Sequence, residues 1–325
     1  MKNILFLTLS LLVLTLTFTG CKKDDPSSSP DEKEDSTRDI YIAGFDNGYI
    51  TYWKNGTEYR LSATPDANDA PSAIAVSGTD VYVTGHVGFT AMLWKNRVAT
   101  ALNNGNSSAH AGGIAFLNND IYIPGFEYGA NSNYILYWKN GVKNILAAIS
   151  GIPAANGIAI SGNDIYIAGN IDDTAVFWKN GVRTTLSRAS NANAIFVSGT
   201  DVYIAGREGA KAVYWKNGIK TVLSEEAYPY AVAVSGADVY VAGTDHSKAV
   251  YWKNGVKSIL PAGETGSAYA TAISVVGTDV YIAGAMQYAT ESAAVYWKNG
   301  VRTTVASTLA AYGNCRATAI VVVDR

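Results

Sequence analysis

Cysteine, histidine and methionine are scarce in this sequence, with two, three and three residues among 325. Cys21 directly follows an apolar leader segment and lies outside the part of the chain that we expect to fold, so Cys315 lacks a partner for an intramolecular disulfide. Stability must therefore come from the burial of apolar side chains. The histidines, His86, His110 and His246, do not have the spacing of a metal-binding motif. We therefore expect neither a metal site nor a cofactor.

Clusters of basic residues are also absent. The chain has 25 lysine and arginine residues against 27 aspartate and glutamate residues, and both signs are spread along it. Nucleic acids bind proteins chiefly through patches of positive charge, so the composition argues against a nucleic-acid partner. One long apolar run is present, from Ile4 to Phe18, and it is shorter than the roughly 20 residues that a membrane-spanning helix needs.

Residues 1–20 combine Lys2, this apolar run and two small residues, which is the pattern of a secretory signal peptide. The sequence Phe18-Thr19-Gly20-Cys21 resembles the lipobox of bacterial lipoproteins. The resemblance implies that Cys21 is lipidated, becomes the mature N-terminus and anchors the protein to a membrane. The alternative interpretation is an ordinary internal cysteine.

Residues 22–38 contain no large apolar side chain, so burial cannot offset the entropy of ordering them. We expect residues 21–38 to be the lipidated cysteine and a disordered tether. The opening Lys-Lys-Asp-Asp resembles the acidic export signal of some Gram-negative surface lipoproteins. It implies an outer-membrane lipoprotein that is exposed on the cell surface, whereas a merely soluble linker is the alternative.

The seven tryptophans all lie in one recurring phrase. Each precedes Lys-Asn, six of them as Trp-Lys-Asn-Gly, at intervals of 41, 44, 40, 37, 37 and 45 residues; they are Trp53, Trp94, Trp138, Trp178, Trp215, Trp252 and Trp297. Spacing of this size is typical of structural repeats. Each unit holds four short runs rich in Val, Ile and Tyr, bounded by turn residues, which indicates four β-strands.

Two kinds of turn recur in the units. Asn-Gly after Trp-Lys predicts a type I′ hairpin, which needs positive φ at both central residues. In the second unit Arg97 replaces the glycine, where left-handed backbone costs roughly 1 kcal/mol. The other turn, Ser-Gly-x-Asp, ends on aspartates that we expect to accept backbone N–H bonds, namely Asp80, Asp164, Asp201 and Asp238.

Seven units of four antiparallel strands predict an all-β fold, a seven-bladed β-propeller over residues 39–325, with blades 1 to 7 numbered by their tryptophans. The chain opens at a second strand and ends on a first strand. Residues 318–323 should therefore pair with the segment after Asp39 and close blade 1. Residues 157–169, GIAISGNDIYIAG, resemble NHL-type propeller repeats, and residues 39–325 are similar to the propellers of bacterial surface lipoproteins.

Tight turns should occupy one end of the propeller, where the tether enters, and variable loops the other end, facing away from the membrane. Loop lengths place an elaborated rim on blades 7, 1, 2 and 3 and leave blades 4 to 6 bare, and insertions often carry function in repeat proteins. Tyrosines in these loops could stack on sugar rings or apolar side chains, or could simply pack the loops; they are Tyr128, Tyr228, Tyr230, Tyr269, Tyr288 and Tyr312.

Uncharged residues stand just before the first strands, at the expected mouth of the central channel. Among them we consider Asn156, Asn193 and Thr271 as candidate ligand-binding residues. Ordered water that satisfies the strand ends is the alternative interpretation. Taken together, these features predict a lipid-anchored envelope module that binds a glycan, a peptide or a protein partner.

A hydrolase or lyase acting on polysaccharide is the alternative function. Glycoside hydrolysis needs paired carboxylates ~5–10 Å apart. Four acids hold equivalent places after the glycine that ends the second strand, on loops that we expect to be solvated; they are Asp46, Glu127, Glu208 and Asp245. Near-identical blades favour binding instead, because catalysis needs unlike groups that converge on one point. We assign no catalytic residue.

Overall fold

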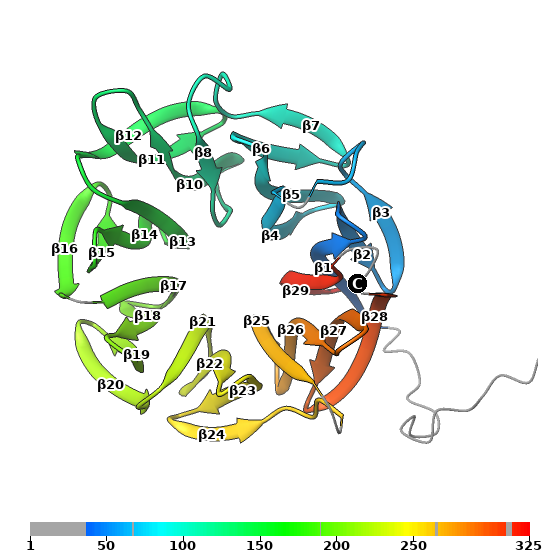
Figure 1. Cartoon of the computed structure of the whole chain (residues 1–325). Helices are drawn as coiled ribbons and strands as arrows, with labels where there is room; N and C mark the ends of the chain where they lie inside the picture. Colours follow the sequence, from blue (N-terminus) through cyan, green and yellow to red (C-terminus); the bar gives the residue numbers. More distant parts are fainter. Residues whose placement is uncertain (1–36, 67, 189, 264–265, 310–313) are drawn as a thin grey trace, which may run out of the picture. The chain divides into compact units, whose positions relative to one another are not determined.

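The structure, a computed structural model, describes residues 37–66, 68–188, 190–263, 266–309 and 314–325. In these residues, 29 strands form seven antiparallel sheets that are arranged radially around one axis (Figure 1). The prediction of a seven-bladed β-propeller is confirmed. No helix in the described part of the chain is long and apolar enough to cross a membrane.

Blades 1 to 3 have their strands in the following order from the axis outward. Blade 1 contains β29 (Arg316–Asp324), β1 (Arg38–Asp46), β2 (Tyr49–Lys54) and β3 (Thr57–Arg60). Blade 2 contains β4 (Ala70–Ser77), β5 (Asp80–Val87), β6 (Thr90–Lys95) and β7 (Val98–Ala101). Blade 3 contains β8 (Ala109–Ala111) and β9 (Ala115–Leu117), which share the inner position, then β10 (Asp120–Tyr128), β11 (Asn133–Lys139) and β12 (Val142–Ile149).

Blades 4 to 7 follow the same order. Blade 4 contains β13 (Pro153–Ser161), β14 (Asp164–Ile171), β15 (Thr174–Lys179) and β16 (Val182–Ser187). Blade 5 contains β17 (Ser190–Ser198), β18 (Asp201–Glu208), β19 (Lys211–Lys216) and β20 (Ile219–Ser224). Blade 6 contains β21 (Ala227–Ser235), β22 (Asp238–Asp245), β23 (Lys248–Lys253) and β24 (Val256–Ile259), and blade 7 contains β25 (Ser267–Val276), β26 (Asp279–Gln287), β27 (Glu291–Lys298) and β28 (Val301–Leu309).

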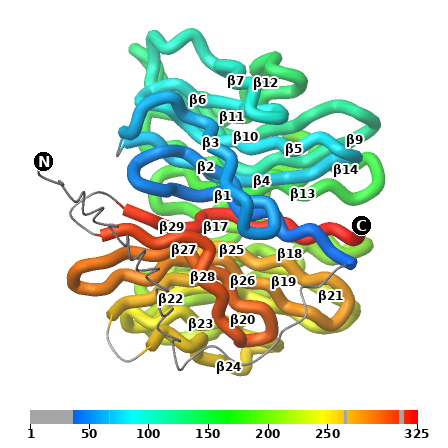
Figure 2. Tube along the Cα trace, turned by 90° about the vertical axis from the view of Figure 1, so that its right-hand side faces the viewer, coloured from blue at the N-terminus to red at the C-terminus, as the bar shows by residue number. Residues whose placement is uncertain are grey.

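The last strand closes the ring on the first, as predicted. β29 pairs antiparallel with β1, from Asp324 opposite Arg38 to Arg316 opposite Phe45. Figures 1 and 2 show the two strands, coloured red and blue, side by side. An ion pair between Arg38 and Asp324 at 3.0 Å fastens the end of this pairing. β29 thus covers the edge of β1 that would otherwise be unpaired.

The core consists of apolar layers between neighbouring blades. Between blades 5 and 6, for example, Tyr203 and Ala205 of β18 form one cluster with Val241 of β22 and Trp252 of β23. All seven tryptophans are buried. Each sheet is therefore covered on both faces by the neighbouring blades, as the continuous apolar runs of the second and third strands require.

Side chains hold the tight turns at one end of the propeller, the plain end. The loops of varying length lie at the opposite end, the variable end. In blade 5, Asn217 and Gly218 have φ of 51° and 82°, and the Asn217 side chain accepts the backbone N–H of Val202 at 2.8 Å. Its amide donates to Asp201 at 2.7 Å. The hairpin prediction is confirmed, whereas the aspartate bonds to a side-chain amide and to Lys216 instead of the expected backbone N–H groups.

The inner strands begin four to six residues before the first isoleucine or valine of their apolar run, except in blade 3, where Gly112 and Gly113 separate β8 from β9. One unpaired residue interrupts the pairing with the second strand, and this β-bulge breaks the alternation that marks a strand. The unpaired residues are Ser72, Asn156, Asn193, Tyr230, Thr271 and Thr318. As a consequence Tyr228, Tyr230 and Tyr269 lie on strands, not on loops.

Candidate functional site

A glycine in every second strand allows the bulged inner strand to pass close by. In blade 5, a Cβ on Gly206 would lie 1.8 Å from the carbonyl oxygen of Asn191 and 3.0 Å from the ring of Trp215. Only glycine permits this approach. The residue that follows the glycine is thereby held beside the inner strand, near the variable end of the propeller.

The blades differ most at this following position. Its occupants in blades 1 to 7 are Phe45, His86, Phe126, Asn170, Arg207, Thr244 and Ala285. Phe45, His86 and Phe126 contact other aromatic or cationic side chains around the ring. Arg207 and Thr244 instead border an open pocket.

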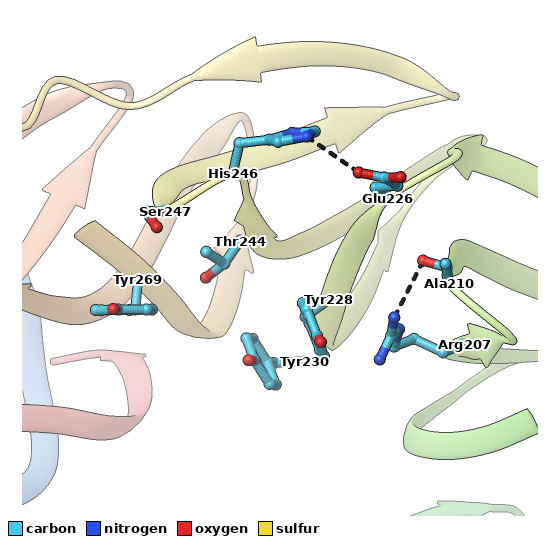
Figure 3. Close-up of a pocket in the computed structure, with 9 residues that line it drawn as sticks. All are labelled: Arg207, Ala210, Glu226, Tyr228, Tyr230, Thr244, His246, Ser247 and Tyr269. Carbon is cyan, nitrogen blue, oxygen red and sulfur yellow. Dashed lines mark hydrogen bonds and ion pairs between the residues drawn. The ribbon is translucent and has the colours of Figure 1, made fainter. Parts of the chain in front are cut away.

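This pocket has a volume of about 450 Å³ and spans blades 5 to 7 at the variable end (Figure 3). Its lining residues are Arg207, Ala210, Glu226, Tyr228, Tyr230, Thr244, His246, Ser247 and Tyr269. The described chain enters at the opposite end, where Arg38 pairs with Asp279 at the start of β26. The pocket therefore lies chiefly on blades 5 and 6, which have the shortest loops, and meets the elaborated rim of blades 7, 1, 2 and 3 only through Tyr269 of blade 7.

Three tyrosines form the aromatic wall of the pocket. Tyr228 and Tyr230 come from β21 and Tyr269 comes from β25, and their exposed fractions are 48%, 39% and 37%. The rings of Tyr228 and Tyr230 are nearly parallel, with an interplanar angle of 15° and centroids 6.4 Å apart. Successive side chains of a strand point to opposite faces, so Tyr228 and Tyr230, which are two residues apart, lie on the same face.

Two polar side chains lie against this wall. The guanidinium of Arg207 stacks 3.8 Å from the ring centroid of Tyr228 and donates from one terminal nitrogen to the carbonyl of Ala210 at 3.3 Å. Thr244, directly across the strand pair from Tyr228, is only 5% exposed. Its hydroxyl and the Arg207 Nε are buried and have no hydrogen-bond partner in the described part of the chain.

A charged group forms the outer rim of the pocket. Nδ1 of His246 lies 2.5 Å from the buried carboxylate of Asp245, and Nε2 lies 3.3 Å from Glu226. The hydrogen bond with Asp245 raises the pKa of His246 above its ordinary value. Burial acts to raise the pKa of Asp245, but hydrogen bonds from Lys257 and His246 outweigh it and lower that pKa.

The turn that carries this rim is held in an unfavourable conformation. His246 and Ser247 both have positive φ, 47° and 63°. Left-handed backbone costs a non-glycine residue roughly 1–2 kcal/mol, and such residues cluster at functional sites. Blade 6 thus keeps two lining residues where glycine would be less strained.

The three candidates at the channel mouth serve contacts between blades. The amide of Asn156 donates to the carbonyl of Ala192 at 3.3 Å, and that of Asn193 donates to Pro229 at 2.8 Å. The Thr271 hydroxyl donates to Ala317 of blade 1 at 2.9 Å. Each bonds the inner strand of the next blade, so these side chains stabilise the ring and leave Tyr230 as the bulge residue that lines the pocket.

The remaining candidates lie elsewhere. Tyr128, at the end of β10, is 38% exposed and packs edge-on against Phe126. The Tyr288 hydroxyl donates to the carbonyl of Ala262 at 3.3 Å and accepts from Arg302, so this tyrosine packs a loop. Tyr312 and Cys21 lie outside the described residues.

The four acids considered for catalysis do not lie on solvated loops as expected. They lie on the second strands, Glu127 one residue before the end of β10 and the other three at the last position, and three of the four, Asp46, Glu127 and Asp245, are buried. The reason is a partner within each blade. Glu127 pairs with Lys143 at 3.1 Å and Asp245 pairs with Lys257 at 2.8 Å.

The other two acids have local partners as well. Glu208 pairs with Lys220, which lowers the pKa of this carboxyl. Asp46 accepts a hydrogen bond from Asn47 at 3.0 Å, and burial raises its pKa. Because the lysines come from the fourth strands, Glu127, Glu208 and Asp245 are held toward the outside of their blades and not toward a common point.

His86 of β5 and His110 of β8 meet, with ring centroids 4.1 Å apart. Burial and the neighbouring His86 lower the pKa of His110 to about 4. No group of three His, Cys, Asp or Glu side chains in the described residues could hold a metal ion. Cys315 is a free, fully buried thiol whose pKa burial raises to about 12.

No protein family model and no curated protein sequence matches the chain. Among solved structures, it is similar to a putative 6-phosphogluconolactonase from Bacteroides fragilis, with 13% identity, a TM-score of 0.55, and 90% of this chain and 100% of that chain covered. It also matches the computationally designed Ika8 protein, with 18% identity, a TM-score of 0.46 and coverage of 81% and 79%. The first likeness supports the propeller fold alone, and NHL-type character remains a resemblance.

Proposed function

We propose that this protein is a lipid-anchored binding module of the cell envelope that recognises a saccharide through the pocket of Tyr228, Tyr230 and Tyr269. The observation that supports it is the convergence of three exposed tyrosines from two blades on one hollow of about 450 Å³. Tyrosine offers an apolar face and a hydroxyl, the two groups that a sugar ring engages. The volume is in the range of ordinary small-ligand pockets.

A saccharide suits this surface better than a folded protein does. Stable protein interfaces bury roughly 800 Å² on each partner and are close to flat over that area. Here three exposed tyrosine rings are gathered within one concave site beside buried polar groups. An extended peptide remains the competing ligand, which the binding experiment distinguishes.

The proposed cellular location is inferred from the N-terminal sequence. The lipobox resemblance at Cys21 implies a lipid anchor, and the acidic segment after it implies an outer-membrane protein on the cell surface. The described chain begins at Thr37, at the plain end, and the pocket opens at the other end.

The likeness to a lactonase scaffold adds no reaction to this proposal, since 13% identity carries fold and not chemistry. The four acids weighed for polysaccharide hydrolysis are each bound to local partners. Binding without turnover is therefore the function that the pocket supports best.

A glycan array probed with the full-length protein in detergent tests the binding proposal. We expect one class of saccharide to bind, and Tyr230→Ala or Tyr269→Ala to weaken that binding roughly tenfold, because each removes one aromatic face. Tyr128→Ala is the matched control, since Tyr128 is equally exposed but lies outside the pocket. Binding of peptides alone, or equal loss with the control, would contradict the proposal.

Cell fractionation tests the anchor. Cys21→Ser should move the protein from the membrane fraction to the soluble fraction, because the acyl chains would have no attachment site. External protease should digest the wild-type protein on intact cells. Unchanged membrane association of the serine variant would remove the lipid anchor from the proposal while leaving saccharide binding untouched.

A further inference from the structure

Arg207 is a cation that a neutral sugar would leave unused. Its stacking on Tyr228 and its bond to Ala210 fix the guanidinium at the pocket wall (Figure 3). Among the described residues, no carboxylate forms an ion pair with it. Arginine presents five N–H donors in a rigid fork, of which the Ala210 carbonyl takes one.

Three lysines on fourth strands near this end of the propeller are neutralised. Lys143, Lys220 and Lys257 each pair with an acid of the same blade. The nearest acid in the chain to Arg207, its neighbour Glu208, is bound by Lys220 and by the hydroxyl of Ser187. The positive charge of Arg207 is thus the one among these four that is left for a ligand.

We propose that the pocket selects a saccharide that carries a carboxylate, of the uronic acid type. The carboxylate binds the terminal N–H groups of Arg207, and the sugar ring lies against the open faces of Tyr230 and Tyr269. This inference rests on the proposed saccharide binding and names the ligand class of that site. Planar carboxylate and planar guanidinium pair through two parallel hydrogen bonds, which gives both affinity and orientation.

The charge balance of the pocket favours a carboxylate over a phosphate. Glu226 stands on the rim and brings one negative charge, which His246 at 3.3 Å partly offsets. A phosphate group carries −1.5 to about −2 near pH 7 and would meet this carboxylate with more repulsion than a single negative charge does. One unpaired arginine matches one carboxylate.

The buried hydroxyl of Thr244 provides a second, independent indication of a polar ligand. In Figure 3 it lies between Tyr228 and Tyr269, and it has no partner in the described residues. Leaving a buried hydroxyl without a hydrogen bond is costly, and native proteins seldom do so without a reason. A ring hydroxyl that settles between these two tyrosines would supply the partner.

Calorimetry on the full-length protein in detergent at pH 7.5 tests this inference with four probes: a galacturonate trisaccharide, its methyl ester, the matching galactose trisaccharide and a sulfated galactose disaccharide. We expect the uronate to bind about tenfold to hundredfold more tightly than the ester or the neutral sugar, the range of a charge-assisted hydrogen-bonded pair. Arg207→Gln should abolish the preference, so that the variant binds uronate and ester with equal affinity. Thr244→Val should weaken all sugars alike.

Arg183→Gln on β16 is the control, because Arg183 is an exposed arginine of blade 4 outside this pocket. Arg207→Lys, which keeps the charge but not the fork, should give intermediate affinity and guards against misfolding of the glutamine variant. Equal affinity for uronate and ester, or tightest binding of the sulfated sugar, would overturn the carboxylate inference while saccharide binding stands. Failure of all four probes in a folded protein, together with a glycan array that shows no binding, would overturn both.

Discussion

One lysine, one asparagine and one aspartate form a recurring cluster at the plain end of the blades. In blade 5, Asp201 receives Lys216 at 2.8 Å and the amide of Asn217 at 2.7 Å, while Lys216 lies over the ring of Tyr203. Asn217 also accepts the N–H of Val202 and takes the left-handed conformation of the turn. A single asparagine therefore closes one turn and holds the start of the neighbouring strand, which explains why the phrase recurs in all seven units.

Arg97 occupies the left-handed position that glycine holds in the other six copies of this turn, with φ of 73°. Arg97→Gly should raise the free energy of unfolding by up to about 1 kcal/mol, because relief of left-handed strain exceeds the added entropy of glycine in the unfolded chain. Urea denaturation measures the change. The reverse substitution in blade 5, Gly218→Arg, should destabilise by a similar amount, and two variants as stable as the wild type would contradict the strain argument.

His110 should make stability fall on acidification. Burial and His86 lower its pKa to about 4, so between pH 6.5 and 4 the unfolded state binds more protons than the folded state does. Stability from this group is complete above pH 6.5 and is lost as pH falls through that window, by at most about 2 kcal/mol at pH 5. His110→Phe, which keeps the stack on Phe126, should flatten the profile of stability between pH 7.5 and 5.

His246 is the control of opposite sign. Its pKa is raised by Asp245, so its contribution is complete below the unfolded pKa and is lost as pH rises through the folded one. His246→Asn should therefore remove a stabilisation that is greater at pH 5.5 than at pH 8. Identical pH profiles for the wild type and both variants would show that neither histidine is coupled to folding.

At the scale of the strand, the close approach of inner and second strands depends on one glycine per blade. Gly206→Ala should destabilise the protein by about 3 kcal/mol, because its Cβ would overlap the Asn191 carbonyl and neither strand can retreat from its neighbouring blades. Thermal unfolding measures the loss. Gly199→Ala is the control: its Cβ would meet nothing within 4 Å, so only left-handed strain of roughly 1 kcal/mol is expected. Equal costs would contradict the packing argument.

The strands could be predicted from the sequence because each strand has a counterpart of similar sequence in the other units of the repeat. Trp215 and its six counterparts fixed the period, and Asn-Gly turns fixed the register of the third and fourth strands. The bulges could not be predicted. An unpaired residue such as Asn193 shifts the alternation of the inner strand by one position, so the segment before it looks like a loop.

The pocket was only partly predictable. Tyr228, Tyr230 and Tyr269 stood out as aromatics outside the core pattern, but of the blades with long loops only blade 7 contributes to the pocket. Arg207 and Thr244 were missed, although a signal existed: the position after the second-strand glycine varies among blades that are otherwise alike. Which of those seven side chains remain unpartnered depends on contacts across blades, such as Arg207 on Tyr228, and a single unit does not reveal them.

For the propeller as a whole, short loops leave the pocket open and long loops are used for packing. The Tyr288 hydroxyl bonds the carbonyl of Ala262, and the indole of Trp297 donates to Pro261 at 2.9 Å, so the long connection before β25 covers blade 7. In blade 6, β21 follows β20 after a short connection, and its Tyr228 and Tyr230 stay exposed. In this ring, the site arises where the repeat is least elaborated.

The closure of the ring provides the test at this scale. Truncation after Asn314 removes β29 and leaves β1 with an unpaired edge, and it also takes away Ile320 and Val322, which pack on Trp53 and Tyr281 between blades 1 and 7. Because each blade is stabilised by its two neighbours, opening one junction should abolish cooperative thermal unfolding and cause aggregation.

Truncation after Val323 is the matched control, since it removes only two residues and their exposed ion pairs with Arg38 and Asp39. Such pairs contribute roughly 0–1 kcal/mol each, so this variant should keep a cooperative transition with a slightly lower Tm. Added peptide of residues 315–325 should restore the transition of the longer truncation by pairing with β1, as an extended segment adds to a free sheet edge. A cooperative transition without β29 or the peptide would mean that six complete blades suffice for cooperative unfolding. The pairing of β29 with β1 would then not be needed to hold the ring together.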